Sequence, residues 1–422
     1  MSGYSHFITT LIIVLGILNI LRMVFFMVGS DIYTVKQALR TRRKKNILFG
    51  LPTFSVIIPA HNEEHTVSCT IQSVIDARYP KDRLEIIVVD DGSTDRTYAI
   101  AEQYRSFRDL NFTVIYQKNA GKAHALNNAM RNHATGELMM CLDADSSLDP
   151  NALMNAASYF VDPRTVALSA NVKIRATGTL FNLIQLFEYL VCYQMKRAQT
   201  IFNIEYIIGG IGSTFRRSAL QQVGFYDTDT ITEDIDLTMK FLLLGNKQHR
   251  VIYGSDVIAY TESVLDLGGL IRQRFRWKYG RAQTFIKNKS LFFSADTKNS
   301  RWLTWFYLPY AIFSDIAFFF EPFMVSYIAY IVIRYGDWAT LVSAIAVIGG
   351  YIAMNILAED TIPRKQKVFL TAIAPIMYLF FYILSYVEYL ALIKTYSKFW
   401  EIPKSIQAGS CGWTHVERAK NP

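Results

Sequence analysis

Apolar residues are distributed unevenly along this chain, and four long apolar blocks constrain its fold more than any other feature. The first block, Phe7–Val28, holds 22 residues with a single charge, Arg22. The others are Leu303–Ile333, Ala339–Ala358 and Val368–Ile393. A helix needs roughly 20 apolar residues to cross the hydrocarbon core of a bilayer. The blocks therefore predict membrane-embedded helices towards both ends of the chain.

The first block does not fit a cleaved signal peptide. Such a signal has a basic start, an apolar run of about 7–15 residues and a small-residue cleavage site. Here no Lys or Arg precedes Phe7, the run is longer, and no Ala-x-Ala follows. We expect a retained transmembrane helix within residues 1–30.

A basic cluster directly follows this helix and indicates its orientation. Residues 31–52 include Lys36, Arg40, Arg42, Arg43, Lys44 and Lys45. Positive flanks stay on the cytoplasmic side of a membrane, so residues 31–52 are predicted to be a basic cytoplasmic linker. A net charge of +9 could also indicate nucleic-acid binding. The position of the cluster beside a membrane helix favours the bilayer instead, and we expect no nucleic-acid partner.

The remaining boundaries follow from where the apolar blocks stop. Residues 53–300 have ordinary soluble composition and are predicted to form one cytoplasmic domain, with interfacial helices near 265–300. Residues 301–395 form the predicted C-terminal transmembrane region, and 396–422 a tail. The expected location is the cell membrane, with several crossings.

Short β-branched runs alternate with helical patterns in the middle of the chain. Phe54–Pro59 and Leu84–Val89 suit buried parallel strands, and Val114–Tyr116 and Glu137–Leu142 continue the series. Helical spacing lies between them, as in Glu63–Ala77. This alternation predicts a doubly wound α/β sheet.

Acidic and polar residues follow three of these strands. They are Pro59–Glu64, Asp90–Asp95 and Asp143–Asp145. Any one of them could be an ordinary turn or helix cap. Because ligands bind beyond the carboxyl ends of the strands in such sheets, three together predict a binding site.

Asp143 and Asp145 are the most specific of these residues. Two carboxylates one residue apart at a strand end can face one hard cation, and Mg²⁺ is commonly held by carboxylates together with substrate phosphates. The chain has neither a G-x-x-x-x-G-K-[ST] loop nor a G-x-G-x-x-G turn after the first strand. We therefore expect a metal and basic side chains, Lys122 among them, to hold a nucleoside diphosphate.

Two later segments add candidate chemistry. Thr232-Glu-Asp234 precedes a predicted helix, where a carboxylate could act as a general base or simply favour a helix N-terminus. In the basic stretch Arg272–Lys278, Gln273, Arg276 and Trp277 share one helix face. That stretch could bind a diphosphate and a sugar ring, or lie on the membrane surface.

Taken in order, these motifs resemble those of processive family-2 glycosyltransferases. The matching residues are Asp90-Asp91, Asp143-x-Asp145, Thr232-Glu-Asp234, Gln273-x-x-Arg276-Trp277, and the segments Gly121–Asn127 and Gly209–Arg217. The resemblance covers about residues 54–283 and implies a glycosyltransferase domain of the GT-A type, flanked by transmembrane helices.

The resemblance also implies a role for each matching residue. Ala60 and Glu63 would lie against the uridine, Asp91 would bind the uracil, and Lys122 would sit near the nucleotide. Asp143 and Asp145 would hold the diphosphate, Asp145 through Mg²⁺ or Mn²⁺. Asp234 would be the catalytic base, while Gln273, Arg276 and Trp277 would bind the acceptor and the diphosphate.

Within this family the layout resembles that of the poly-N-acetylglucosamine synthases. This implies an inverting, processive enzyme that polymerises a β-linked polysaccharide from UDP-N-acetylglucosamine and moves it across the membrane. The implied partners are the donor, the growing glycan, the lipid bilayer and a small membrane accessory subunit. The alternatives are another β-glycan, such as hyaluronan, a chitin oligomer or a glucan, and non-processive transfer to a lipid or glycan. The tail segment Gly412–Arg418 loosely resembles a gating segment.

Overall fold

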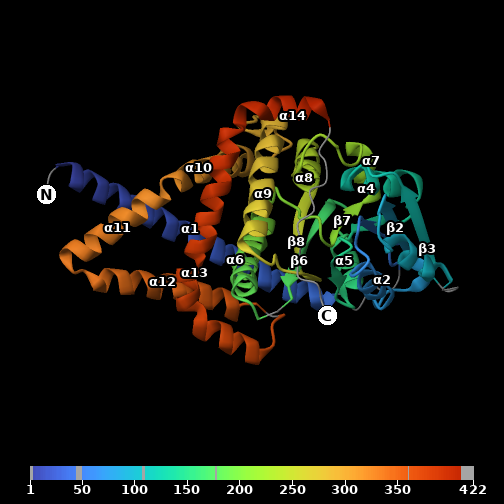
Figure 1. Ribbon diagram of the computed structural model, residues 1–422, viewed down its shortest axis with the longest axis horizontal. Helices are drawn as coiled ribbons and strands as arrows, with labels where there is room; N and C mark the ends of the chain where they lie inside the picture. The colour runs from blue at the N-terminus through green and yellow to red at the C-terminus, as the bar shows by residue number, and fades with distance from the viewer. Residues whose placement is uncertain (1–2, 44–49, 107–109, 176–177, 360, 410–422) are drawn as a thin grey trace.

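An α/β domain and a set of long apolar helices make up the molecule (Figure 1). The computed structural model describes residues 3–43, 50–106, 110–175, 178–359 and 361–409. Within them lies an eight-stranded sheet with the strand order β3-β2-β1-β4-β7-β6-β8-β5. The strands are β1 Phe54–Ala60, β2 Leu84–Asp91, β3 Asn111–Gln117, β4 Leu138–Cys141, β5 Ser147–Leu148, β6 Thr165–Ile174, β7 Ser213–Arg216 and β8 Arg250–Thr261.

The first four strands lie where the β-branched runs predicted them. β1 pairs in parallel with both β2 and β4, and β2 pairs in parallel with β3. β7 then runs antiparallel to β4 and β6, so the complete sheet is mixed. The parallel part confirms the predicted α/β class and puts the ends of β1, β2 and β4 at one edge.

Helices cover both faces of this sheet. They are α2 Val67–Ile75, α3 Thr97–Glu102, α4 Lys122–Asn132, α5 Ala152–Tyr159, α6 Leu180–Phe202, α7 Arg217–Val223, α8 Glu233–Leu243 and α9 Leu267–Lys287. Successive strand residues point to opposite faces. Ile57 thus packs in one core with α4, α7 and α8, and Val56 and Ile58 pack in the other with α2 and α5.

Most of the apolar helices extend away from the sheet, while α13 runs alongside α9 (Figure 1). They are α1 Gly3–Arg43, α10 Leu308–Phe319, α11 Glu321–Tyr335, α12 Trp338–Leu357 and α13 Arg364–Ser397, and the short α14 Ile402–Ala408 follows. By length and composition, α1 and α13 could cross a membrane. The bent pair Trp302–Phe319 and Glu321–Tyr335, with 49° between its halves, could make one further crossing. Helix α1 continues to Arg43, so the first part of the expected linker is helical.

The segment between α12 and α13 returns to the α/β domain. Glu359 binds Arg197 of α6 at 3.0 Å, and the ammonium of Lys173 in β6 lies 3.6 Å from the same carboxylate. The far end of α13 also reaches the domain, because α14 packs on α9 and Gln283 donates a hydrogen bond to Ser405 at 2.9 Å. Both ends of α13 are therefore attached to the α/β domain.

Candidate active site

One cavity of about 770 Å³ opens at the edge of the sheet where β1, β2 and β4 end. Its walls come from the loops after β1, β3 and β4, the start of α8, and one side each of α6 and α9. Eight of the residues singled out from the sequence line it: Glu63, Lys122, Asp143, Asp145, Asp234, Gln273, Arg276 and Trp277. The fold thus brings together residues that lie up to 214 positions apart (277 − 63).

The other two residues predicted for the site do not line the cavity and are buried. Ala60, the last residue of β1, and Asp91 are fully buried. The Asp91 carboxylate accepts hydrogen bonds from the backbone N–H groups of Ala120 and Gly121, at 2.9 and 2.7 Å, and from the Gln117 amide at 2.8 Å. It thereby anchors the loop that leads into Lys122. Contact of Ala60 and Asp91 with uridine stays a prediction.

A tight turn lets this loop approach the end of β2. Gly92 has φ = +70°, and a Cβ there would meet the backbone nitrogen of Asn119 at 2.6 Å. Any other residue would be strained and would push the Asn119 loop outwards. Glycine is therefore required at position 92.

Lys122 is the central cation of the site. Its ammonium donates a hydrogen bond to Oδ1 of Asp143 at 2.5 Å and lies 3.8 Å from Oε1 of Glu233. Burial disfavours the charged ammonium, but the carboxylates of Asp143, Glu233 and Asp234 outweigh this and raise the pKa of Lys122 above its usual range. Lys122 is therefore cationic at neutral pH.

Asp145 presents to the cavity a carboxylate of the kind that binds divalent cations. Its carboxylate lines the cavity beside Asp143, and Oδ1 accepts a hydrogen bond from the Ser146 hydroxyl at 3.0 Å. Carboxylate oxygens are the ligands that Mg²⁺ prefers, and substrate phosphates usually complete its shell. The residues present fit such an ion.

Asp234 is a carboxyl group whose environment suits proton transfer. Burial, followed by the nearby charge of Glu233, raises its pKa to about 7, although Lys122 and Arg276 act in the opposite direction. Helix α8 begins at Glu233, so Glu233 and Asp234 lie in its first turn instead of preceding it. A carboxyl with a pKa near neutrality is well matched to general-base chemistry.

Helix α9 presents its predicted face to the same cavity. Gln273 is 7% exposed, and within the described part of the chain its Oε1 accepts no hydrogen bond. The Arg274 guanidinium lies 4.4 Å from the centroid of the Trp277 ring. A buried, unused acceptor beside an aromatic face is suited to a hydroxyl-rich ligand such as a sugar.

Two site residues gained their importance only from the structure. A Cβ at Gly210 would lie 2.8 Å from the Lys122 ammonium and 3.9 Å from carboxylate oxygens of both Asp143 and Asp234. Glu233 tunes Asp234 and contacts Lys122. Both occur in segments already noted, but neither spacing nor composition reveals these contacts.

The cavity continues between α6, α9 and α13, where charged side chains are paired. Arg274 binds Glu188 of α6 at 2.6 Å, and Lys278 binds Glu388 of α13 at 2.9 Å. Lys278 also binds Asp315 of α10 at 3.0 Å. Asp315 and Glu388, which lie within the C-terminal apolar blocks, therefore have a cationic partner on α9.

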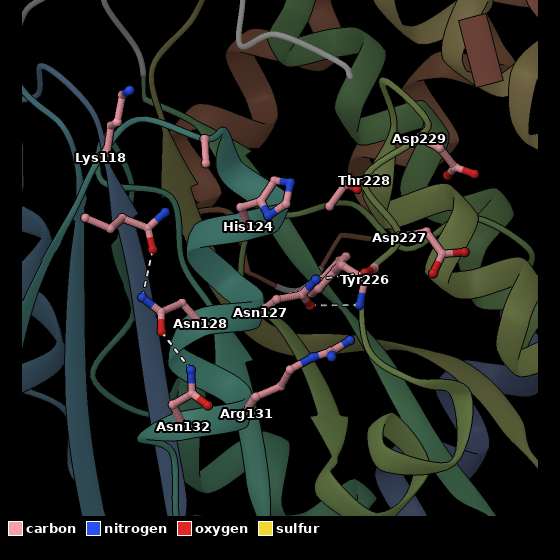
Figure 2. Close-up of a pocket in the computed structure, with 12 residues that line it drawn as sticks. Lys118, His124, Asn127, Asn128, Arg131, Asn132, Tyr226, Asp227, Thr228 and Asp229 are labelled. Carbon is pink, nitrogen blue, oxygen red and sulfur yellow. Dashed lines mark hydrogen bonds between the residues drawn. The ribbon is translucent and has the colours of Figure 1, made fainter. Parts of the chain in front are cut away.

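A second, shallower pocket of about 720 Å³ lies over the outer face of α4 (Figure 2). Its amides are largely satisfied by one another: Asn128 donates to Gln117 at 2.8 Å and Asn132 donates to Asn128 at 2.9 Å. Asn127 donates to the backbone oxygen of Tyr226 at 2.8 Å. We assign no ligand to this pocket.

Comparison with known proteins identifies the domain around the main cavity. Residues 55–224 match the family described as Glycosyl transferase family 2. They form a family-2 glycosyltransferase domain. Asp234 and α9 lie beyond the matched residues.

Curated relatives resemble the chain over a longer stretch. The poly-beta-1,6-N-acetyl-D-glucosamine synthase of Staphylococcus epidermidis is 34% identical over 236 residues, which is 56% of each chain. That of Staphylococcus aureus (strain COL) is 32% identical over 272 residues, which is 63% of this chain and 64% of the relative. The chain thus aligns with about three-fifths of the length of these relatives.

A solved structure shares the GT-A fold of this domain. It is the mannosyltransferase PcManGT from Pyrobaculum calidifontis, solved in complex with GDP-Man and Mn²⁺. The TM-score is 0.54 at 23% identity, and the match covers 90% of this chain and 98% of that one. The family-2 domain therefore has the glycosyltransferase fold expected from its motifs.

Proposed function

We propose that this protein is a membrane-embedded, inverting, processive glycosyltransferase that polymerises a β-linked N-acetylglucosamine polysaccharide from UDP-N-acetylglucosamine. The observation that carries the proposal is the single cavity lined by Asp143 and Asp145, Asp234, and the Gln273–Trp277 face of α9. It offers room for a donor and an acceptor on either side of one carboxyl group. The choice of sugar is supported by the similarity to the staphylococcal synthases.

The roles of the residues follow from their positions. Asp234 would accept the proton of the acceptor hydroxyl as that oxygen attacks the anomeric carbon. Attack opposite to the departing UDP inverts that carbon, so an α-linked donor yields a β-linkage. Lys122 and Arg276 would stabilise the negative charge that develops on the diphosphate. Because the leaving group is stabilised by cations, the reaction requires no general acid.

A divalent cation, Mg²⁺ or Mn²⁺, belongs to this proposal. Asp145 would hold it, and when bound it would neutralise charge on the diphosphate. On the acceptor side, Gln273 would bind a sugar hydroxyl through its unused Oε1, and Trp277 would present its ring to a sugar face.

The membrane arrangement is also a proposal. We infer a cytoplasmic catalytic domain, because the basic end of α1 adjoins it. Because both ends of α13 are attached to the domain, we infer that α13 does not cross the membrane. Three crossings would then be made by α1, by the bent pair α10–α11 and by α12. Helix α14 then lies on the side of the catalytic domain. The expected gating segment, Gly412–Arg418, lies outside the described residues. The proposal also includes transport of the polymer across the membrane and binding of a small membrane accessory subunit.

Membranes containing the protein test this function directly. Labelled UDP-N-acetylglucosamine and Mg²⁺ should yield a high-molecular-weight product, and Asp234→Asn should abolish it. A panel of UDP-sugars with linkage analysis identifies the polymer. A product carrying a single added sugar would instead establish non-processive transfer, and full activity of Asp234→Asn would disprove the role of the base.

A further inference from the structure

Three carboxylates enclose one lysine ammonium at the C-terminal end of α9. Lys287, the last residue of that helix, binds Asp227 at 2.6 Å, Asp229 at 2.6 Å and Asp236 at 2.7 Å. The carboxylate oxygens lie within 4.8 Å of one another, a spacing that could hold a metal ion. Here the ammonium of Lys287 fills that position.

Asp236 makes this cluster costly to disturb. Its side chain is fully buried, and its other oxygen accepts a hydrogen bond from the Asn288 amide at 2.8 Å. A buried carboxylate requires a cation and hydrogen-bond donors to offset its lost hydration. Lys287 and Asn288 supply both from the end of α9.

The cluster lies at the start of the helix that carries the proposed base. Asp236 is two residues beyond Asp234 in the first turn of α8, and Asp227 and Asp229 lie in the segment that leads into that helix. Lys287 therefore connects the helix that presents Gln273, Arg276 and Trp277 to the segment that presents Asp234.

A second contact fixes the same two segments closer to the cavity. A Cβ at Gly280 of α9 would meet Cγ2 of Thr232 at 2.5 Å, so the helix packs directly on the residue at the start of α8. The backbone N–H of Ile231 donates to Oε1 of Gln283 at 3.0 Å. The segment that precedes Asp234 thus contacts α9 at two positions, Gly280 and Gln283.

We propose that Lys287 is a positioning residue that fixes the acceptor-side helix α9 relative to Asp234. The inference rests on the proposed function, in which α9 binds the acceptor. The ammonium occupies a position that three carboxylates would otherwise offer to a metal ion. It thereby holds the acceptor hydroxyl within reach of the base without contacting either substrate.

Loss of this connection should uncouple transfer from donor cleavage, because water would then attack the anomeric carbon in place of the acceptor hydroxyl and release UDP and free sugar. In Lys287→Met, three carboxylates would repel one another and α9 would shift relative to α8, while the donor residues Lys122, Asp143 and Asp145 lie on other elements. A displacement of about 1 Å can lower a rate by up to about 10²-fold. We expect polymer formation to fall about tenfold or more and more free sugar to be released per UDP. UDP affinity should fall much less, because Arg276 alone among the proposed diphosphate-binding residues lies on α9.

Three further variants make the test specific. Lys287→Arg keeps the cation and should restore most of the polymer-to-free-sugar ratio. Gly280→Ala forces α9 away from Thr232 without changing any charge, and should uncouple the reaction in the same way. Lys240→Met is the matched control, because Lys240 belongs to α8 and binds Asp227 at 2.6 Å and the Phe225 carbonyl at 2.8 Å. It should leave the polymer-to-free-sugar ratio unchanged.

The experiment uses purified full-length protein. It measures the UDP dissociation constant, the total UDP released, and the amounts of polymer and free sugar formed. A wild-type ratio in Lys287→Met overturns the proposal. So does a loss of UDP binding in step with activity in both Lys287→Met and Gly280→Ala, because the cluster would then serve folding alone. If the wild type adds only one sugar, processivity fails, yet the ratio of transfer to donor cleavage still tests Lys287.

Discussion

The ammonium of Lys122 lies 2.5 Å from Oδ1 of Asp143 and so joins the start of α4 to the end of β4. Both side chains line the main cavity together with Asp145. The lysine neutralises a carboxylate that would otherwise repel an incoming diphosphate. In the proposed function, a bound diphosphate would therefore meet a carboxylate whose charge is already paired, with the ammonium of Lys122 beside it.

Replacing Lys122 tests this relationship. We expect Lys122→Met to weaken UDP binding about tenfold or more, because a charge-assisted hydrogen bond contributes roughly 1.5–3 kcal/mol and Asp143 would lose its cation. Titration calorimetry with UDP measures the effect. Lys118→Met, which removes an exposed lysine just beyond β3, is the control and should bind UDP normally. Equal affinity in both variants would exclude a role for Lys122 in donor binding.

The raised pKa of Asp234, about 7, predicts an unusual acid limb in the pH–rate profile. The base works only when deprotonated, so kcat/KM of the free enzyme should rise with pH through a midpoint near 7. An ordinary carboxyl group would place that midpoint near pH 4. Glu233→Gln removes a like charge, lowers the pKa of Asp234 and should move the limb to lower pH. A limb that stays in place would show that Glu233 does not tune the base.

Gly210 offers a steric test of the same site. In Gly210→Ala the added methyl would lie 2.8 Å from the Lys122 ammonium. The flexible lysine can retreat, so the protein should fold while kcat/KM falls about tenfold. At the adjacent Gly209 a Cβ meets nothing within 4 Å, and Gly209→Ala should lose much less. Similar losses in the two variants would contradict the proposed crowding of Lys122.

Cysteine labelling in intact cells tests the membrane arrangement. Asp337 lies between α11 and α12, and Lys404 lies in α14; both are exposed. In a background without the native cysteines, an impermeant thiol reagent should label Asp337→Cys. It should label Lys404→Cys only after the cells are permeabilised. Labelling of Lys404→Cys in intact cells would mean that α13 crosses the membrane and that the attachment of both its ends to the catalytic domain is wrong.

Local patterns predicted much of the fold. The β-branched runs placed β1 to β4, because buried parallel strands require apolar side chains on both faces. They did not predict that β7 runs antiparallel beside β4, since strand direction depends on how the intervening helix packs. The apolar blocks likewise indicated membrane helices, but block length alone did not indicate that α13 starts and ends at the same domain.

For the candidate site too, local sequence patterns predicted some features and the tertiary structure decided the others. Residue type and spacing placed carboxylates at strand ends and Gln273, Arg276 and Trp277 on one helix face, because strand geometry and the helical repeat are local properties. The contacts of Lys122 with Asp143, of Gly210 with Lys122, and of Lys287 with three aspartates join segments far apart in the chain. The tertiary structure alone decided these contacts and the pKa of Asp234. Burial and charge proximity arise only when distant segments pack together, and no periodicity along the chain encodes them.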